Sequence, residues 1–468
     1  MRWVVTFALV VGCGDDGMVN PLPDAPPPDA DQSCPPVTGA GTEHQGTIGL
    51  DETWTAAASP HILTFNVSVQ NATLTIEPCA VVRIRKGFTI TIGANTGPSA
   101  ALVAQGESVG GTIRGITFER ADAAMPWGSI RAFPTGRIDF EHVHLSGGAD
   151  PDTAQNGGGS IVASGNGGNM GTTANLRVVD VTVEGSAGFG VNLVNRSVFT
   201  ADSANLVITG AGTMPGTNML ARYPLAVEGP AVSTVPTGTY TGNAIDAIRL
   251  SNSSSLLDST IVFPSRGVPY QIADSFSMAP QTSVAAGGLS TLTIEAGVTI
   301  KFSAGGPANI WAMTLGSSNG ALPVNIFPVR VIAQGTAAQP IVLTSSAPTP
   351  AAGDWGGIEW RGGAATGNVM SHVRIEYAGG DSGSAGFGCG EGDNDAALII
   401  ANWRPDDVFI TDSTISDSAA GGIVSGWQSD LDGPSLVSNN TFTNVASCRV
   451  SRWRNGNGTC PGTPPVCL

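Results

Sequence analysis

The stretch Leu292–Phe302, LTIEAGVTIKF, decides the fold, because two runs of alternating apolar and polar residues flank a short turn. Alternation with a period of two predicts half-buried β-strands, and a glycine at the break suits the positive φ of a tight turn. A related stretch occurs earlier in the chain, as LTIEPCAVVRI at residues 74–84. The sequence therefore contains two related copies of a unit built from short strands.

Further pairs of related segments follow in the same order and with nearly the same separation. They are Val103–Gly106 with Ile332–Gly335, Trp127–Ile130 with Trp355–Ile358, His142–Val143 with His372–Val373, and Val179–Val183 with Thr411–Ile415. Such ordered self-similarity is typical of a duplicated repeat protein. We predict a first module at residues 44–260 and a second at residues 261–468.

The spacing within a module distinguishes among a β-sandwich, a propeller and a coiled β-solenoid. Ile332, Trp355 and Val373 are separated by 23 and 18 residues. Solenoid coils repeat at roughly 20–30 residues and propeller blades at roughly 40–50. The spacing favours the solenoid, and no segment shows a helical pattern.

The composition excludes several classes of protein. The 468 residues include 63 glycines and 31 prolines, 41% are hydrophobic, and only 12% are charged. The 21 basic and 37 acidic residues give a net charge of −16, and the only lysines are Lys86 and Lys301. Nucleic-acid binding needs clustered basic residues, and wholesale disorder needs fewer apolar ones. A stacked solenoid tolerates few charges, because equivalent positions of successive coils lie one strand spacing apart and like charges there would repel each other.

The N-terminus has the features of an export signal. Arg2 precedes the apolar stretch Trp3–Val11, which is too short to span a bilayer as a helix. The following Val10–Cys13, VVGC, resembles a bacterial lipobox, in which the cysteine is lipid-modified. We therefore expect a signal peptide at residues 1–12, a lipid anchor on Cys13 and a Pro/Asp-rich tether over 13–43. The expected location is the outer membrane or cell surface; the alternative is a free cysteine after a chance apolar start.

The remaining cysteines favour disulfides in an exported protein. They are Cys34, Cys79, Cys389, Cys448, Cys460 and Cys467. We expect a Cys34–Cys79 bond, with the other four pairing among themselves, although six cysteines allow 15 pairings. Zinc binding is the alternative, but neither a C-x2-C spacing nor nearby histidines accompany these cysteines.

A longer resemblance is carried by LTIEAGVTIKF, VIAQGTAAQPIVLTSSAP, GDWGGIEWRG, VRIEYAGG and ITDSTISDSAAGGI. These segments resemble the right-handed parallel β-helix repeats of exported bacterial lipoproteins in the pectate-lyase-like superfamily. The resemblance covers most of residues 44–450 and is strongest in the second module. In the first, Cys79 and Ala80 depart from the turn pattern. The resemblance implies an all-β, right-handed parallel β-helix, whose groove often accommodates polysaccharide, but it implies no activity.

Residues present in both copies are expected to be structural, because each copy needs them to complete a coil. They are Trp127 and Trp355, His142 and His372, Glu77 and Glu295, and Asp180 and Asp412. Functional residues are therefore sought among those found in one copy only, and none of them stands out as catalytic.

An acidic, Gly-rich loop occurs only in the second module. Its carboxylates are Asp381, Glu391, Asp393 and Asp395, which are candidate ligands for Ca²⁺. Lyases of the resembled fold use Ca²⁺ with an Arg or Lys base, a role that Arg374 or Arg404 could take. A solvated acidic loop held by a disulfide explains the same residues. No cofactor other than Ca²⁺ is expected.

Tryptophans unique to the second module are candidate sugar-binding residues, because an aromatic face stacks on a sugar ring. Trp311, Trp360, Trp403 and Trp427 lack counterparts in the first module, and Trp360, Trp403 and Trp427 are the candidates. Core filling is the alternative for each. We therefore predict a non-enzymatic surface protein that binds or displays, with a glycan or a surface protein as partner. The alternative function is a polysaccharide lyase or glycoside hydrolase with its site in the second module.

Overall fold

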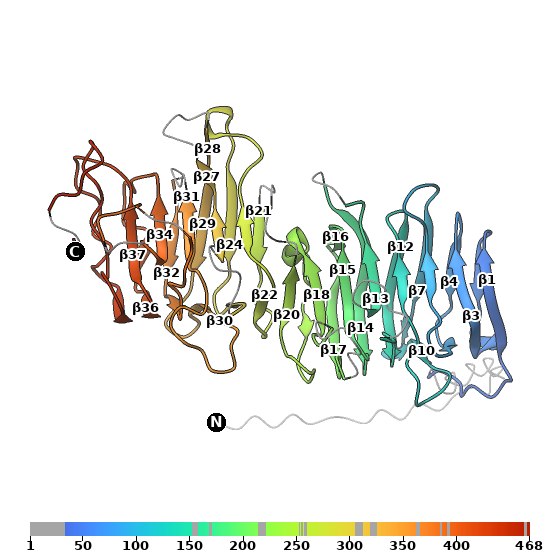
Figure 1. Ribbon diagram of the computed structural model, residues 1–468. Helices are drawn as coiled ribbons and strands as arrows, with labels where there is room; N and C mark the ends of the chain where they lie inside the picture. Colours follow the sequence, from blue (N-terminus) through green and yellow to red (C-terminus); the bar gives the residue numbers. More distant parts are fainter. Residues whose placement is uncertain are drawn as a thin grey trace, which may run out of the picture.

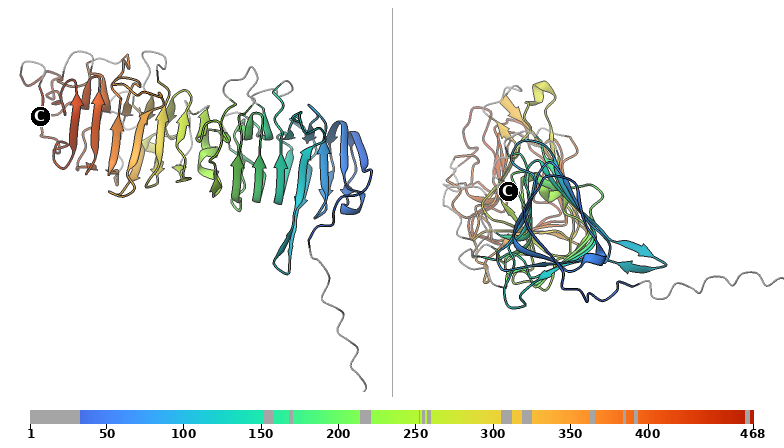
Figure 2. Two further views of the ribbon diagram at one scale, coloured as in Figure 1. Left: turned by 90° about the horizontal axis from the view of Figure 1, so that it is seen from below. Right: turned by 90° about the vertical axis from the view of Figure 1, so that its right-hand side faces the viewer.

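The protein is a right-handed parallel β-helix (Figure 1). The computed structural model describes residues 33–468 except 152–157, 168–170, 214–220, 252, 254–255, 257–259, 305–311, 319–324, 362–365, 384–385, 391–393 and 463–465. Seen along its axis, the stack of coils has a triangular outline (Figure 2). The predicted fold class is confirmed. The signal peptide, Cys13 and most of the tether lie outside the described residues.

The largest sheet runs the length of the helix and begins in the first module. There it contains β1 (Thr42–Ile48), β2 (Glu52–Trp54), β3 (His61–Val69), β4 (Thr73–Ile76), β5 (Val81–Ile84), β6 (Ile90–Ile92), β7 (Ala100–Gln105), β10 (Ile116–Arg120), β11 (Ile130–Ala132), β12 (Gly136–Ser146), β13 (Gly159–Ser164), β14 (Thr173–Glu184), β15 (Phe189–Val194), β16 (Ser197–Phe199), β17 (Ala204–Thr209), β18 (Leu225–Glu228), β19 (Gly238–Thr239) and β20 (Ile248–Ser251). Strands β3 and β14 each pair with two successive strands of the next coil, and β12 pairs with both β7 and β10 of the preceding coil. These three strands therefore turn a corner and belong to two faces of the triangle.

The second module continues this sheet and adds two others. The continuation is β22 (Tyr270–Ile272), β25 (Thr299–Phe302), β30 (Ile341–Ser345), β33 (Val373–Glu376), β36 (Thr414–Ser418) and β38 (Thr441–Val445). The second sheet is β21 (Thr260–Phe263), β24 (Ser290–Ile294), β29 (Val329–Gln334), β32 (Val369–Ser371) and β35 (Ile410–Thr411). The third is β23 (Phe276–Met278), β26 (Met313–Leu315), β31 (Ile358–Arg361), β34 (Ala396–Ala401) and β37 (Gly421–Gly426).

Two antiparallel hairpins and three short 3-10 turns complete the described elements. The hairpins are β8 (Glu107–Val109) with β9 (Thr112–Arg114), and β27 (Ser317–Ser318) with β28 (Ile326–Phe327). The turns are η1 (Ala56–Ala58), η2 (Gly229–Thr234) and η3 (Val284–Ala286). Within the described residues, no helix has the length and apolar character required to traverse a bilayer.

The core is built from ladders of identical or similar apolar residues. Leu74, Leu102, Ile138 and Leu176 are register partners on β4, β7, β12 and β14, and all are buried. Each inward residue therefore packs on its counterpart about 4.8 Å away in the next coil. This repeated burial is the reason for the period-two pattern in the sequence.

The corners of the coils explain why certain polar residues recur in both modules. His142, Asp180, His372 and Asp412 all have positive φ, between 49° and 53°. The side chains also bond along the stack, since Asp180 accepts a hydrogen bond from the amide of Asn205 at 2.8 Å. Short polar side chains that bond locally are tolerated in this left-handed conformation. The structural interpretation of these repeated residues is confirmed.

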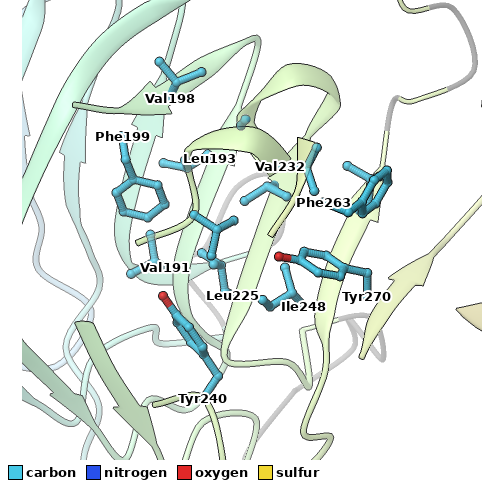
Figure 3. Packing of buried hydrophobic residues seen from close by; sticks show 14 of the residues in the cluster. Val191, Leu193, Val198, Phe199, Leu225, Val232, Tyr240, Ile248, Phe263 and Tyr270 are labelled. Atoms are coloured by element: carbon cyan, nitrogen blue, oxygen red, sulfur yellow. The ribbon is translucent and has the colours of Figure 1, made fainter. Parts of the chain in front are cut away.

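The two predicted modules meet without a break in the core. At this junction η2 lies between β16 and β21: the hydroxyl of Thr234 accepts from the backbone of Phe199 at 3.2 Å, and that of Ser233 accepts from Val262 at 2.9 Å. Buried Tyr240 and Tyr270 pack in the same region, near Leu225 and Phe263 (Figure 3). The junction therefore stacks the modules into one continuous β-helix.

Disulfides fix both ends of the stack. The expected Cys34–Cys79 bond is present and ties the start of the described chain to the turn before β5. Near the other end, Cys389 pairs with Cys460 and Cys448 with Cys467. The last residues are thereby held across the final coils.

Candidate functional site

The residues shared by the two modules make the same contacts in each copy. The indole nitrogen of Trp127 donates to the carbonyl of Ser146 at 2.7 Å, and that of Trp355 donates to the carbonyl of Glu376 at 2.8 Å. Both indoles are buried. The shared His and Asp pairs have the same positive φ in both copies, which agrees with a place in the scaffold.

Glu77 and Glu295 show the same equivalence. A carboxylate oxygen of Glu77 accepts from the backbone N–H of Ala56 at 3.1 Å, and one of Glu295 accepts from that of Ser265 at 2.7 Å. Each glutamate thus supplies a hydrogen-bond acceptor to a backbone N–H at a corner of the preceding coil. Backbone N–H groups need such acceptors wherever the strand ladder does not provide one.

The acidic loop does not present a complete cation site within the described residues. Asp395 accepts from the backbone N–H of Ser382 at 3.0 Å and from its hydroxyl, while Asp381 accepts from the N–H of Gly383 at 2.9 Å. No group of three or more histidine, cysteine, aspartate or glutamate side chains in the described ranges is placed to hold a metal ion. Glu391 and Asp393 lie outside those ranges, so the Ca²⁺ site stays a prediction.

Trp360 must be removed from the candidate sugar-binding residues. Its side chain is fully buried, and its indole nitrogen donates to the carbonyl of Val329 at 3.2 Å. Ile358 and Trp360 lie on the same side of β31 and both face the core, so neither can stack on a ligand.

Trp403 and Trp427, by contrast, line one groove near the C-terminal end of the β-helix. The groove has a volume of about 540 Å³. Its lining residues come from four segments of the chain: Gly386 and Phe387, Asn402 to Arg404, Gly426 to Gln428, and Arg454 with Gly456. We call this feature the C-terminal groove. Among the described residues, its lining contains two arginines and no acidic side chain.

The two tryptophans contribute differently to the groove. Trp403 is half-buried; it packs edge-on against Trp360 at 5.4 Å and donates from its indole nitrogen to the carbonyl of Trp360 at 3.1 Å. Trp427 is only 3% exposed and stacks on Trp453, with ring centroids 5.6 Å apart. Of the two tryptophans, Trp403 is therefore the one with a surface left for a ligand, and Trp427 is buried beneath the groove.

The arginines keep hydrogen-bonding capacity that the protein does not use. Arg404 donates to the carbonyl of Asp432 and lies 3.5 Å from the carboxylate of Asp406, which is almost wholly exposed. Arg454 donates to the carbonyl of Gly458 at 3.4 Å. Among the described residues, the Nε atoms of both arginines have no acceptor. Because a guanidinium group binds oxygen acceptors through charge-assisted hydrogen bonds and both arginines line the groove, the groove suits a ligand rich in oxygen acceptors.

The C-terminal tail forms one wall of the groove. The N–H of Arg454 donates to the carbonyl of Trp427 at 3.1 Å, and Arg454 forms a parallel β-bridge with Gln428. The tail therefore pairs with residues 427–429 of the preceding coil. The N–H of Cys389 donates to the carbonyl of Arg452 at 2.8 Å, and the Cys389–Cys460 bond joins this tail to the loop that bears Phe387. Both walls are therefore held by one disulfide.

Sequence reasoning missed Arg454, Gln428 and Asn402. Arg454 lies in a tail whose path depends on disulfide pairing, and pairing cannot be deduced from six cysteines. Asn402 has a φ of 66°, and its amide donates to the hydroxyl of Ser318 at 3.2 Å. A signal was available for Gln428, because it directly follows the candidate Trp427.

Comparison with known protein families supports the fold. Residues 265–401, within the predicted second module, match the family model of the pectate-lyase like beta helix domain. The predicted resemblance to pectate-lyase-like β-helices is confirmed over this segment. No curated protein and no solved structure matches the chain. The C-terminal groove includes residues inside and beyond the matched segment.

Proposed function

We propose that the protein is an exported, lipid-anchored β-helix that binds glycan chains in the C-terminal groove without transforming them. The observation that carries the proposal is the groove itself, in which the half-buried Trp403 lies beside Arg404 and Arg454. An aromatic face for the apolar side of a sugar and charged donors for its oxygens are the two contacts that glycan recognition needs.

The charge of the lining favours acidic sugars. Arg404 and Arg454 both line the groove, while the protein as a whole has a net charge of −16. A guanidinium binds a carboxylate through paired, charge-assisted hydrogen bonds. Asn402 and Gln428 add amide groups that can bond neutral hydroxyls. A glycan with uronic acid units fits this combination.

A polysaccharide lyase is the second candidate, and the position of Arg404 favours it. This side chain was one of two possible bases, and it lines the groove, whereas Arg374 lies exposed on β33. The two functions differ in whether the bound chain is cleaved, so a product assay distinguishes them.

The test is to titrate oligogalacturonate, oligoalginate and a neutral xylooligosaccharide into the protein while tryptophan fluorescence is recorded. We expect saturable binding of the acidic oligosaccharides and weaker binding of the neutral one. Arg404→Gln combined with Arg454→Gln should weaken acidic binding by about tenfold or more, which corresponds to about 1.4 kcal/mol. Arg374→Gln is the matched control and should bind like the wild type.

The same samples, with and without Ca²⁺, are assayed for new reducing ends and unsaturated uronate. Absence of both products agrees with a binding protein. Turnover that is lost in Arg404→Gln would establish the lyase instead. The anchor has its own test, in which Cys13→Ser should release the protein from the membrane fraction.

A further inference from the structure

Three apolar side chains, two exposed and one partly buried, lie at the same corner of successive coils at the N-terminal end. Phe65 is at the bend of β3, Phe88 is in the turn after β5, and Met125 is in the turn after β10. Backbone bonds stack these turns: Val67 N–H donates to the carbonyl of Thr89 at 3.1 Å, and Gly87 N–H donates to that of Pro126 at 3.2 Å. We call Phe65, Phe88 and Met125, with the intervening Arg85 and Lys86, the N-terminal ridge.

The ridge is unusually apolar for a surface. Phe65 is 58% exposed and Met125 41%, and the rings of Phe65 and Phe88 lie 5.3 Å apart. Phe88 is partly buried and packs against the core, so it supports Phe65 from below. Single exposed apolar residues are ordinary, but a contiguous set on one edge marks an interaction surface.

Basic residues occupy the same ridge. Arg85 and Lys86 belong to the turn that ends at Phe88, whose N–H donates to the carbonyl of Arg85 at 3.2 Å. Lys86 is one of two lysines in the chain. Arg85 is half-exposed and lies 3.8 Å from the exposed carboxylate of Glu43, a weak contact that a stronger anion can replace. Aromatic side chains beside Arg and Lys are the combination that enters the headgroup region of a bilayer.

The position of the ridge agrees with such a contact. The described chain enters the fold through Cys34, which is bonded to Cys79, and this cysteine belongs to the coil that also carries Arg85 and Phe88. Only residues 14–33 separate Cys34 from Cys13 in the sequence. The C-terminal groove lies at the opposite end of the stack, where β37 is seen in Figure 1.

We propose that the N-terminal ridge binds a phospholipid surface: Phe65 and Met125 enter the boundary between headgroups and acyl chains, Phe88 supports Phe65 from the core side, and Arg85 and Lys86 bind lipid phosphates. This contact goes beyond the proposed function and does not require the lipid on Cys13. It places the first coils against the bilayer, and the C-terminal groove is then carried away from it.

The experiment uses the full chain with Cys13→Ser, so that no lipid anchor contributes. The protein is sedimented with vesicles of phosphatidylethanolamine and phosphatidylglycerol, and the bound fraction is measured. We expect binding that falls by about tenfold or more when Phe65→Ser and Met125→Ser are combined, since burial of these side chains drives the insertion. The matched control combines Val408→Ser with Leu431→Ser, which remove two exposed apolar residues (44% and 69%) from the second module.

Two further measurements keep the proposal open to refutation. The circular dichroism and melting temperature of each variant show whether the fold persists. The double variant Arg85→Gln/Lys86→Gln leaves the apolar residues intact and should weaken vesicle binding several-fold. Equal binding by the ridge and control variants would overturn the proposal. The proposal would also be overturned if the ridge joined two copies of the chain. Sedimentation velocity would then show dimers of the parent protein and monomers of the Phe65→Ser/Met125→Ser variant. Glycan binding is measured separately and does not depend on either result.

Discussion

The two modules share a scaffold and differ in what they carry on it. In both, a buried tryptophan bonds a carbonyl, a glutamate bonds a corner N–H, and His and Asp turn the corner with positive φ. The C-terminal groove has its lining in the second module alone, between residues 386 and 456. The difference teaches that internal duplication separates structural from functional residues without other sequences. Residues kept in both copies close the coil, and the groove is lined by residues of one copy, although the unique Trp360 lies in the core.

The largest expected effect comes from removing a shared tryptophan. Trp127→Ala and Trp355→Ala should each destabilise the protein by about 3–5 kcal/mol, because each leaves a large cavity and frees a buried carbonyl. Thermal and urea denaturation followed by circular dichroism measure the change. Trp403→Ala is the control and should cost less, since its indole is only half-buried. The scaffold interpretation is wrong if Trp355→Ala lowers glycan affinity but leaves stability unchanged.

A pH effect on stability is expected in the first module. His44 lies with its Nε2 2.9 Å from Nδ1 of His61 and stacks on buried Trp54 at 4.0 Å. The pKa of His44 is lowered to about 4, mainly because burial disfavours its charged form. Electrostatic repulsion from His61 adds to the shift, and attraction to Glu52 opposes it. The folded pKa is below the unfolded value of about 6.5, so this stabilisation is complete above pH 6.5 and is lost as the pH falls towards 4.

Between pH 7 and pH 4 the free energy of unfolding should fall by about 3 kcal/mol by linkage. Urea denaturation at the two pH values measures this change as a lower midpoint. His44→Phe keeps a ring on Trp54 and should flatten this dependence. His144→Phe removes a more exposed histidine and serves as the control. A pH profile unchanged by His44→Phe would contradict the prediction.

A smaller effect is expected at the corners. Asp180→Val and Asp412→Val should each destabilise their module by about 1–2 kcal/mol, because a β-branched residue is strained at φ of 52° or 53°. Asn at either position keeps the local hydrogen bonding and should be tolerated. Denaturation midpoints give the comparison; similar losses for Val and Asn would show that charge, and not backbone strain, matters there.

Much of the fold could be predicted from particular residues. The LTIEAGVTIKF pattern of Leu292–Phe302 gives two strands and a turn, and the structure has β24 and β25 there. The related stretch at residues 74–84, in the first module, indicated the duplication. The inward position of Trp360 was also readable, because Ile358 and Trp360 alternate with Glu359.

The site could be predicted only in part. Trp403 and Trp427 were found because the first module lacks them, but nothing in the sequence places Arg454 beside them. Their meeting depends on the path of the tail, which is set by the Cys389–Cys460 bond and by contacts between residues far apart in the chain. Local patterns specify strands and corners; they do not specify which loops converge.

Hydrogen–deuterium exchange with saturating acidic oligosaccharide tests the central claim most directly. The account predicts slower exchange in the segments that line the C-terminal groove, at residues 402–404, 426–428 and 454–456, with no change in the first module. Protection confined to the first module, or spread over the repeated scaffold with none at the groove, would contradict it.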